Sequence, residues 1–546
     1  MVQLLGIFSF LVVLLRAAIM CAQSICVGGV IFLLLAARGE LPDLEDIRRR
    51  AWRLIRWSAL ALGAAQLFFL LSNSFMLTAS ADITFRDVLG ADFVLAGILA
   101  IGAALVMVFW PTQTGARMTP ILLVPAGLMV AASVMTSHSA SRIEGRALLV
   151  GLTALHYLAV AAWIGGLPYL VMAMKRIVDG GARARVGQTF SRMAQVSVAI
   201  LFVAGLWLSY VYVGSWDATY GTAYGVMILT KVALFGCLLM LGAGNYYVVH
   251  KLGTESAAAT SSVIHFGEVE IGIGLTVILA AASLTSQPPA ADLTQDRVTR
   301  QEIATRFKPR MPRLTSPDLK ELSEPSKQMV KRAAETGHSL PPAYVPGQAV
   351  WHPDKPSDLA WSEYNHNWAG LIVFVMAILA LLSRSRYFAW AKIWPLSFLG
   401  LAVFLFLRAD PENWPLGPNG FWESFGEADV LQHRAAVVLL ILFAVFQWMV
   451  ENERLKSQFA ALVFPFVCAV GGVVLLTHTH ALGNIKEEML TELSHTPLAI
   501  FGIVAGWSRW LELRLPAENQ TKKYLAWVWP VCFMFVGLIL LNYHET

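Results

Sequence analysis

Five histidines near the ends of apolar segments are the residues of this sequence whose type best suits metal binding. They all lie in the last third of the chain: His366, His433, His478, His480 and His495. Imidazole is the commonest metal-binding side chain, and one ion needs about four ligands in one place. We therefore predict that the five converge on a metal site, with His138 in a nearby loop. For each histidine taken singly, an interfacial hydrogen bond is the alternative role.

His478 and His480 have the closest spacing in this set. On a regular helix, residues two apart point about 200° from each other, whereas in an extended segment they share a face. Gly483 and Asn484 follow shortly afterwards, which favours a chain that has left the helix here. We therefore expect the two imidazoles to be able to chelate one ion.

The first half of the chain holds a second set of polar residues, placed inside apolar segments. They are a predicted ion pathway: Arg16, Asp92, His156, Trp163 and Lys231. Ionisable groups inside a membrane are rare and usually functional. His156 and Trp163 are seven residues apart and so lie nearly on one helix face. Asp92 and Lys231 are both expected toward the outer side, where they could pair, while Arg16 has no evident partner. Paired structural charges are the alternative.

Two further acids, Glu268 and Glu270, fall near the expected inner end of their apolar segment. Long side chains at such a position can extend to the interface and keep the charged group in water. We interpret both as interfacial residues, and their use in an ion route stays open.

The composition indicates a membrane protein. Hydrophobic residues make up 57% and charged residues 14%, and the mean hydropathy is +0.60, whereas soluble domains have about 25% charged residues. A membrane-spanning helix needs about 20 mostly apolar residues, and about fourteen such stretches occur here. We predict an all-α, polytopic helical bundle with about 14 transmembrane helices. The two halves show no convincing sequence repeat.

Basic residues predict the orientation. With the N-terminus outside, the inner loops hold 22 lysines and arginines, and the short outer loops hold five. Cytoplasmic loops are enriched in these residues. The alternation therefore places both termini, and the ends that carry the five histidines, on the outer side.

A hydrophilic interruption divides the chain. Residues 287–365 carry 11 of the 24 prolines and no sustained apolar run, which is typical of a loop without its own packed core. We expect an eight-span half at 1–286, a Pro-rich outer loop at 287–365 and a six-span half at 366–546 with a His-rich outer end.

Several sequence motifs of other transporter and enzyme classes do not occur. The chain has no phosphate-binding Gly-x-x-x-x-Gly-Lys run, no aspartyl-phosphate motif and no Cys-Pro-Cys run. The five cysteines fall within predicted spans and predict no disulfide framework. ATP-driven pumping, nucleic-acid binding and enzymatic catalysis are therefore not predicted.

Several motifs resemble those of the copper resistance protein D (CopD) family. The run Leu155-His156 through Ala159, Trp163 and Gly165-Gly166-Leu167 is similar to the family's "LH-x-x-A-x-x-W-x-GGL" helix, within a core at about 148–286 that includes Lys231 and Asn245. The second half resembles the long members of the family at Asn365-His366, Gln432-His433-Arg434, Thr477-His478-Thr479-His480 and Ser494-His495-Thr496-Pro497.

The resemblance implies a bacterial inner-membrane protein that handles copper. It implies copper uptake or transfer from the periplasm toward the cytoplasm, with copper as the bound ion and a periplasmic copper-binding protein as an expected partner. The histidine-lined site would then belong to the outer face.

Two other functional classes stay open. Histidines on facing helices are also how membrane b-type cytochromes hold haem, so the same five histidines could include an axial pair for haem b. A non-catalytic membrane assembly scaffold, whose histidines only stabilise the bundle, is the third possibility. A haem absorption band in the purified protein would separate the second class from the others.

Overall fold

The computed structural model describes residues 2–37, 42–80, 84–111, 119–251, 257–293, 297–318, 322, 356–411, 413–425, 428–477 and 485–545. Thirteen helices within these ranges are long and apolar enough to cross a membrane, and Pro120–Met135 is a shorter apolar helix. Among the described residues the remaining pairing is one isolated bridge between Asn413 and Asn419. The predicted all-α polytopic fold is confirmed.

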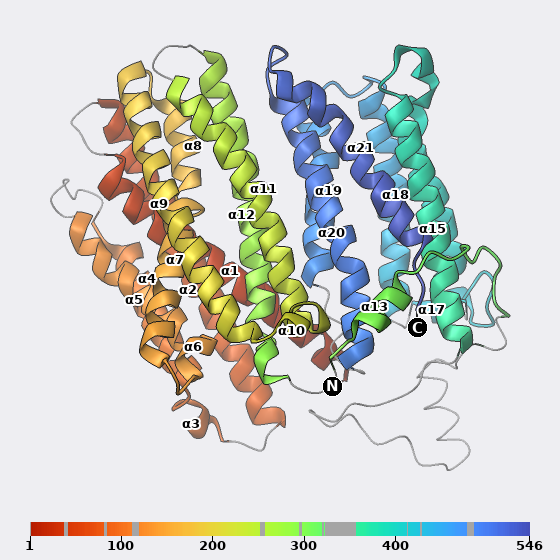
Figure 1. Cartoon of the computed structure of the whole chain (residues 1–546), viewed down its shortest axis with the longest axis horizontal. Coiled ribbons are helices and arrows are strands. Elements are labelled where there is room, and N and C mark those ends of the chain that lie inside the picture. Colours follow the sequence, from red (N-terminus) through yellow and green to blue (C-terminus); the bar gives the residue numbers. More distant parts are fainter. Residues whose placement is uncertain are drawn as a thin grey trace. The chain divides into compact units, whose positions relative to one another are not determined.

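The chain forms two compact units (Figure 1). The first comprises Gln3–Arg297 with Arg514–Glu518, and the second comprises Val298–Leu513 with Asn519–Thr546. The long helices of the first unit are α1 (Val2–Leu35), α2 (Pro42–Ser80), α4 (Asp92–Phe109), α5 (Leu123–Met135), α7 (Arg146–Trp163), α8 (Leu167–Arg176), α9 (Gly180–Val213), α11 (Ala223–Lys251) and α12 (Ala257–Leu284). Short elements join them: α3 (Phe85–Val88), η1 (Thr119–Leu122), α6 (His138–Ser141), α10 (Trp216–Gly221) and η2 (Ala290–Asp292).

The second unit is built in the same way. Its elements are α13 (Arg300–Arg306), α15 (Pro356–Leu382), η4 (Arg386–Leu396), α16 (Ser397–Arg408), α17 (Phe421–Ser424), α18 (Ala428–Glu451), α19 (Gln458–Thr477), α20 (Ile485–Arg514) and α21 (Gln520–Leu541). Aromatic and small residues from α15, η4, α19, α20 and α21 meet in one core, which includes the fully buried Trp394 and Trp529.

Local sequence determines where these helices begin and end. Asp179 caps α9, because its carboxylate accepts a hydrogen bond from the Ala182 N–H at 2.6 Å. Gly214 ends the same helix with a φ of +74°, a conformation that glycine adopts without a steric penalty. The apolar run between them is therefore bounded by a cap and a stop signal.

In the first unit, α1 lies very close to the break between α7 and α8. A Cβ added to Gly165 would lie 1.8 Å from the Ser24 carbonyl oxygen, and one added to Gly28 would lie 2.2 Å from the Ala161 oxygen. Real Cβ atoms do not approach other atoms so closely, so this crossing requires glycine at both positions. The glycine pair that follows Trp163 thus fixes the position of this residue against α1.

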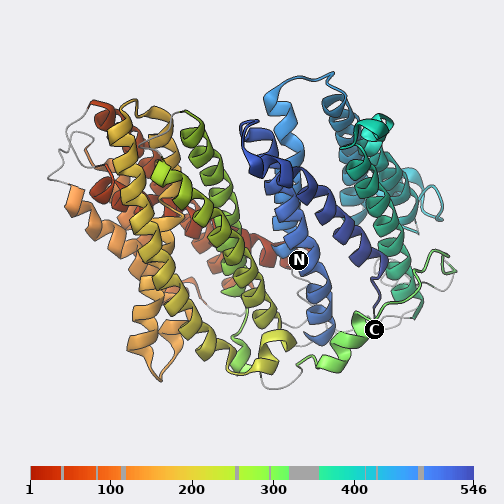
Figure 2. The same ribbon diagram turned by 45° about the horizontal axis from the view of Figure 1, so that its top comes forward.

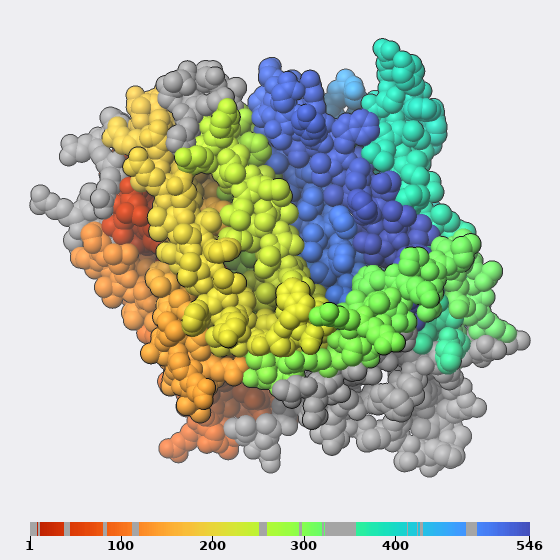
Figure 3. Space-filling model, viewed as in Figure 1, coloured from red at the N-terminus to blue at the C-terminus, as the bar shows by residue number. Residues whose placement is uncertain are grey.

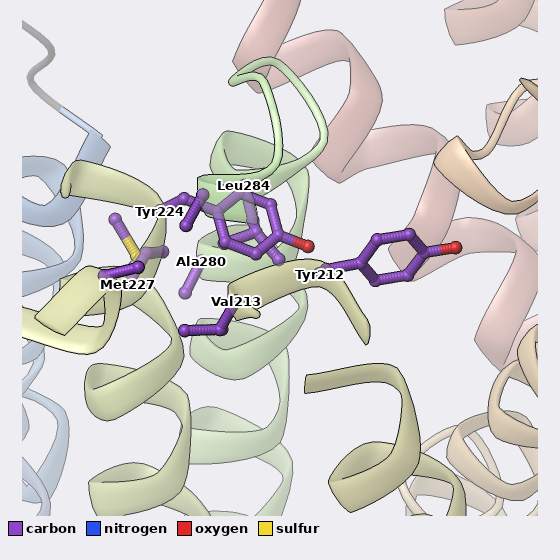
Figure 4. Close-up of a cluster of buried hydrophobic side chains, with 8 residues drawn as sticks. Tyr212, Val213, Tyr224, Met227, Ala280 and Leu284 are labelled. Atoms are coloured by element: carbon purple, nitrogen blue, oxygen red, sulfur yellow. The ribbon is translucent and has the colours of Figure 1, made fainter. Parts of the chain in front are cut away.

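A hydrophobic cluster joins α9, α11 and α12 at one end of the first unit (Figure 4). Tyr224 and Leu284 lie within it, and the Tyr212 ring extends away from them (Figure 4). The Tyr212 hydroxyl lies 2.7 Å from the Ser139 hydroxyl, which lies 2.6 Å from that of Thr153. The cluster thereby connects α9 to α6 and α7.

In the second unit, α15 and α21 lie side by side in both ribbon views (Figures 1 and 2). A Cβ added to Gly370 would lie 2.5 Å from the Leu541 nitrogen, and one added to Gly537 would lie 2.6 Å from the Phe374 nitrogen. The backbones can approach so closely because both positions lack a side chain. The contact brings the residues one turn before Gly370 next to the chain that follows α21.

The described part of the Pro-rich region packs on the second unit. Residues 297–318, bright green in Figure 3, cover the adjacent ends of its helices. Thr299 caps α13 through a reciprocal bond with Glu302, and Arg306 is 5% exposed. Most residues of this stretch are exposed, and Val298 and Arg306 are the buried ones among the described residues 297–318, so the stretch contacts the unit without forming a core of its own.

Candidate functional site

Three elements of the second unit bring His366, His495 and Tyr543 together. The ring centroids of His366 and His495 are 6.0 Å apart. Tyr543, just after α21, stacks on His366 at 4.0 Å and meets His495 edge-on at 5.9 Å. We call these three residues the His366–His495–Tyr543 cluster.

The hydrogen bonds of the two imidazoles determine which nitrogen carries the proton. His366 Nδ1 lies 2.8 Å from the Ser362 carbonyl oxygen, and His495 Nδ1 lies 2.8 Å from that of Thr491. A carbonyl oxygen can only accept, so Nδ1 is the donor in both rings. The lone pair of each neutral imidazole is therefore on Nε2. Histidines that bind metals commonly have one ring nitrogen bonded to a carbonyl oxygen in this way.

Charged residues surround Tyr543. The Arg306 guanidinium lies over the tyrosine ring, 5.0 Å from its centroid, and donates to its hydroxyl at 3.2 Å. The hydroxyl in turn donates to Glu545 at 2.7 Å, and Glu545 also accepts from the Ser362 hydroxyl at 2.6 Å. Burial raises the pKa of Tyr543, so the phenol stays protonated at neutral pH. The tyrosine is thus a fixed, neutral neighbour of the two histidines.

The Pro-rich region covers this cluster. The Thr305 carbonyl oxygen accepts from His544 Nε2 at 2.8 Å, and the Leu314 carbonyl oxygen accepts from the Trp368 indole at 3.1 Å. The Arg313 N–H donates to Asn367 at 2.6 Å. A cavity of about 190 Å³ lies beneath, lined by Arg306, Phe307, Ser494, Leu538, Ile539, Asn542, Tyr543 and His544. We call residues 299–314 the strap.

The structure brings together His366 and His495 from the predicted set of five. The Nδ1 of His433 lies 2.8 Å from Asp410. His478 and His480 lie outside the described residues, in the connection between α19 and α20. Within the part of the chain that the structure describes, no group of three His, Cys, Asp or Glu side chains could hold a metal ion.

The structure agrees with some of the predictions for the pathway residues of the first unit and differs from others. The Trp163 ring meets Phe235 of α11 at 6.2 Å. The His156 ring faces α9, where a Cβ added to Gly205 would lie 3.9 Å from its Cε1 atom. The buried Nδ1 of His156 has no hydrogen-bond partner among the described residues.

Arg16 and Asp92 differ from expectation. Arg16 does have a partner, since it donates to the Thr285 carbonyl oxygen at 2.8 Å and lies over the Phe69 ring. Asp92 is exposed in the first turn of α4, and the described residues show no ion pair between it and Lys231. The suggested Asp92–Lys231 pair is therefore not formed among the described residues.

Glu270 is a buried residue that the sequence interpretation missed. It is 2% exposed and lies midway along α12. Its carboxylate accepts from the Asn245 amide and from the Trp163 indole. The interpretation of Glu270 as an interfacial, snorkelling residue is therefore wrong. The spacing carried the signal: residues two apart on a helix point about 200° from each other, so Glu268 and Glu270 cannot face the same way.

Glu268 has the ion partners that Glu270 does not. It lies 3.0 Å from Lys175 Nζ on α8 and 3.3 Å from His265 Nδ1, one turn earlier on α12. Arg514 is a third partner of this carboxylate, at 3.1 Å. These ion pairs agree with the interpretation of Glu268 as an interfacial residue.

Comparisons with known proteins agree with the residue motifs. The chain is 26% identical over 293 residues to the copper transport protein CutJ of Bacillus subtilis (strain 168), an alignment that covers 50% of this chain and 52% of that protein. It thus spans about half the length of this curated relative. No solved structure matches the chain. Residues 184–284, which include Lys231, Asn245 and Glu270, match the family model of copper resistance protein D. In this region the chain is therefore similar to the CopD family, and it is also similar to a copper transport protein.

Proposed function

We propose that this protein carries copper from the periplasm toward the cytoplasm across a bacterial inner membrane. The observation that supports it best is the meeting of His366 and His495, each with Nδ1 bonded to a backbone carbonyl. Two neutral imidazoles with Nε2 lone pairs suit copper. The CopD match of residues 184–284 and the name of the relative support the choice of this metal.

His478 and His480 are the proposed further ligands. The connection that contains them ends at Ile485, where α20 begins, and His495 lies within that helix. Four imidazoles would meet the ligand number of a closed transition-metal site. His433 stays a proposed ligand as well, because an Nδ1 bond to a carboxylate such as Asp410 is common in metal-binding histidines.

The basic residues support the orientation. With 22 lysines and arginines in the inner loops and five in the short outer loops, the positive-inside bias favours a site open to the periplasm and both termini on that side. We propose that the strap faces the periplasm, where a copper-binding protein could deliver the ion.

A division of labour between the halves is part of the proposal. The half at 366–546 would receive copper, and the half at 1–286, with its CopD core, would provide the passage through the membrane. His156, Trp163, Lys231 and Arg16 are the proposed polar lining of that passage, and Asp92 would act at its exposed end. The loop at 287–365 would cover the receiving site.

The test compares the full-length wild-type protein with a His366→Ala/His495→Ala double variant. We expect the purified wild type to bind copper, supplied as Cu(I) with ascorbate, and to admit it into proteoliposomes, and the variant to lose both activities. A haem absorption band would instead support the haem b alternative. A folded wild-type protein that neither binds nor transports copper and shows no haem band would exclude the first two functions, and the scaffold role would remain.

A further inference from the structure

We propose that Glu270 is a proton-exchange group, and that inward proton movement through it drives copper uptake. The coupling rests on the proposed copper transport, whereas proton binding by Glu270 does not. The inference rests on the groups that surround this carboxyl group, which lies within residues 184–284.

Glu270 is isolated from other charges. It is 2% exposed, and α8 and α11 pack on its helix. Lys175 and His265 bond to Glu268. Lys231 lies about 21 Å along α11 from Asn245, the residue of that helix that bonds to Glu270. No charged residue among the described ones acts on Glu270. A membrane-embedded carboxylate without a cation is costly, and such residues in pumps and transporters serve as proton relays.

The partners of Glu270 suit a carboxylate. The Asn245 amide nitrogen and the Trp163 indole nitrogen both direct an N–H group at it. Two donors stabilise the anion by charge-assisted hydrogen bonds. The deprotonated state is therefore accommodated without an ion pair.

The same partners suit the protonated acid. The buried Asn245 Oδ1 has no hydrogen-bond partner among the described residues. An amide carries both donor and acceptor atoms, and rotation by about 180° exchanges them. After rotation, Oδ1 would accept the O–H of a protonated Glu270 while the Trp163 indole keeps its bond to the other oxygen. Asn245 can thus satisfy either state of the carboxyl group.

This donor set favours a proton over copper as the ion bound at Glu270. Amide and indole N–H groups are donors and cannot ligate a cation. A copper ion needs several nitrogen or sulfur ligands, and the described residues provide no such group around this acid. In the proposed step, the carboxylate takes up one H⁺ from the outer side, becomes the neutral acid, and releases the H⁺ to the inner side.

Polar groups occur at intervals along the first unit on both sides of Glu270. In one direction α12 carries Glu268 and His265 with Lys175 beside them, and in the other it ends near Thr285, where Arg16 binds. Glu270 lies about 22 Å from Thr285 along the helix, at 1.5 Å per residue. His156 lies about 10 Å from Trp163 along α7. A proton would need water or rearrangement between these groups, with Glu270 at mid-depth as the site of exchange.

The experiment uses full-length protein in proteoliposomes and two readouts. Infrared difference spectra between acidic and basic pH detect the C=O band of a protonated carboxylic acid, and uptake of copper, supplied as Cu(I) with ascorbate, is measured with and without an imposed pH gradient. The variant is Glu270→Gln, an isosteric neutral mimic of the acid. The control is Glu144→Gln, the same substitution at an exposed position of the first unit.

We expect Glu270→Gln to lose the acid band and the stimulation of copper uptake by the gradient, and Glu144→Gln to keep both. Copper exchange at equal concentrations on both sides should persist in Glu270→Gln, because it requires no net driving force. The proposal would be overturned if Glu270→Gln kept the carboxylic-acid band and the stimulation of copper uptake by the pH gradient. Loss of bound copper from this variant would also overturn it.

Two further results separate the proposals. A Glu270-dependent acid band in a wild type that moves no copper would support the proton site and refute copper transport. Copper uptake that the gradient does not stimulate would refute the coupling alone. If Glu270→Gln does not fold, Asn245→Ala should shift the pH midpoint of the acid band, and an unchanged midpoint would overturn the proposal.

Discussion

The ring of His366 lies 6.0 Å from that of His495, although the two residues belong to different helices far apart in the sequence. Both rings also meet Tyr543, which follows a third helix. Each imidazole is held on its own helix by its Nδ1 bond. The distance between the two rings therefore depends on how α15, α20 and α21 pack. Changes that disturb this packing should therefore affect the metal site without altering a ligand.

The first prediction tests which histidines form the proposed site. His366→Ala should weaken copper binding at least tenfold, because loss of an outer-shell partner alone costs about 10–100-fold in metal affinity. His265→Ala should leave the affinity nearly unchanged, since this histidine belongs to the first unit. Competition titration against a copper chelator would measure both. An equal loss in the two variants would show that the site is not confined to the second unit.

The second prediction concerns the approach of α15 to α21. Gly370→Ala should destabilise the protein by about 1–3 kcal/mol, as overpacking does, because the new Cβ would meet the Leu541 nitrogen at 2.5 Å. Gly400→Ala is the matched control: no atom lies within 4 Å of its added Cβ, so the higher helix propensity of alanine should keep or raise the stability. Thermal unfolding of the detergent-solubilised variants distinguishes these outcomes. Equal melting temperatures would show that α15 and α21 are not in this close contact.

The third prediction concerns the strap. Arg306→Ala removes the guanidinium from the Tyr543 ring and hydroxyl, so hydrogen exchange of the backbone in residues 299–314 should become faster. Arg310→Ala is the control, because exposed Arg310 contacts Asn542 through its backbone N–H and not through its side chain. Mass spectrometry after brief deuterium labelling would measure the rates. Protection that is equal in wild type and Arg306→Ala would mean that other strap contacts suffice.

The fourth prediction concerns pH and His138. Burial lowers the pKa of His138, which lies beside Tyr212 and Tyr224. The unfolded chain has the ordinary histidine pKa of about 6.5, so below that pH the unfolded state binds a proton that the folded state does not. His138 therefore contributes stability above pH 6.5 that is lost as the pH falls toward its lower folded pKa. The melting temperature should fall less between pH 7.5 and pH 5.5 in His138→Gln than in the wild type. An identical pH dependence would contradict the assignment.

The fifth prediction tests the orientation. The native cysteines all lie within apolar helices, so single cysteines introduced at exposed Ser316 and exposed Ser457 can report the two sides of the second unit. An impermeant maleimide should label Ser316→Cys in intact spheroplasts and Ser457→Cys only after lysis. The opposite pattern would place the histidine site in the cytoplasm.

The helices were predictable from the sequence because hydropathy over about 20 residues is a local property. The stretch at Pro120–Met135 is the one apolar helix among the described ranges that is shorter than a typical span. Helix ends such as those of α9 also follow from local residues, the cap Asp179 and the stop Gly214. These features do not depend on how the helices pack.

The site was predictable only in part, because its geometry depends on contacts between distant segments. The meeting of His366 and His495 requires the crossing at Gly370, and nothing in the spacing of the histidines specifies that crossing. Similarly, the partner of Arg16 is a carbonyl group at the end of α12, and backbone acceptors leave no sequence signal. For Glu270, helical geometry did contain the information, and Asn245 was visible in the family-like motif.

The contacts of the last residues have a practical consequence for purification. Glu545 binds Ser362 and Tyr543, and His544 binds the Thr305 carbonyl group. An affinity handle of consecutive histidines after Thr546 would therefore begin beside His366 and His495 and supply competing imidazoles to any metal there. Metal-to-protein ratios measured on such a fusion would count ions held by the handle. A cleavable, metal-free handle attached elsewhere avoids this error.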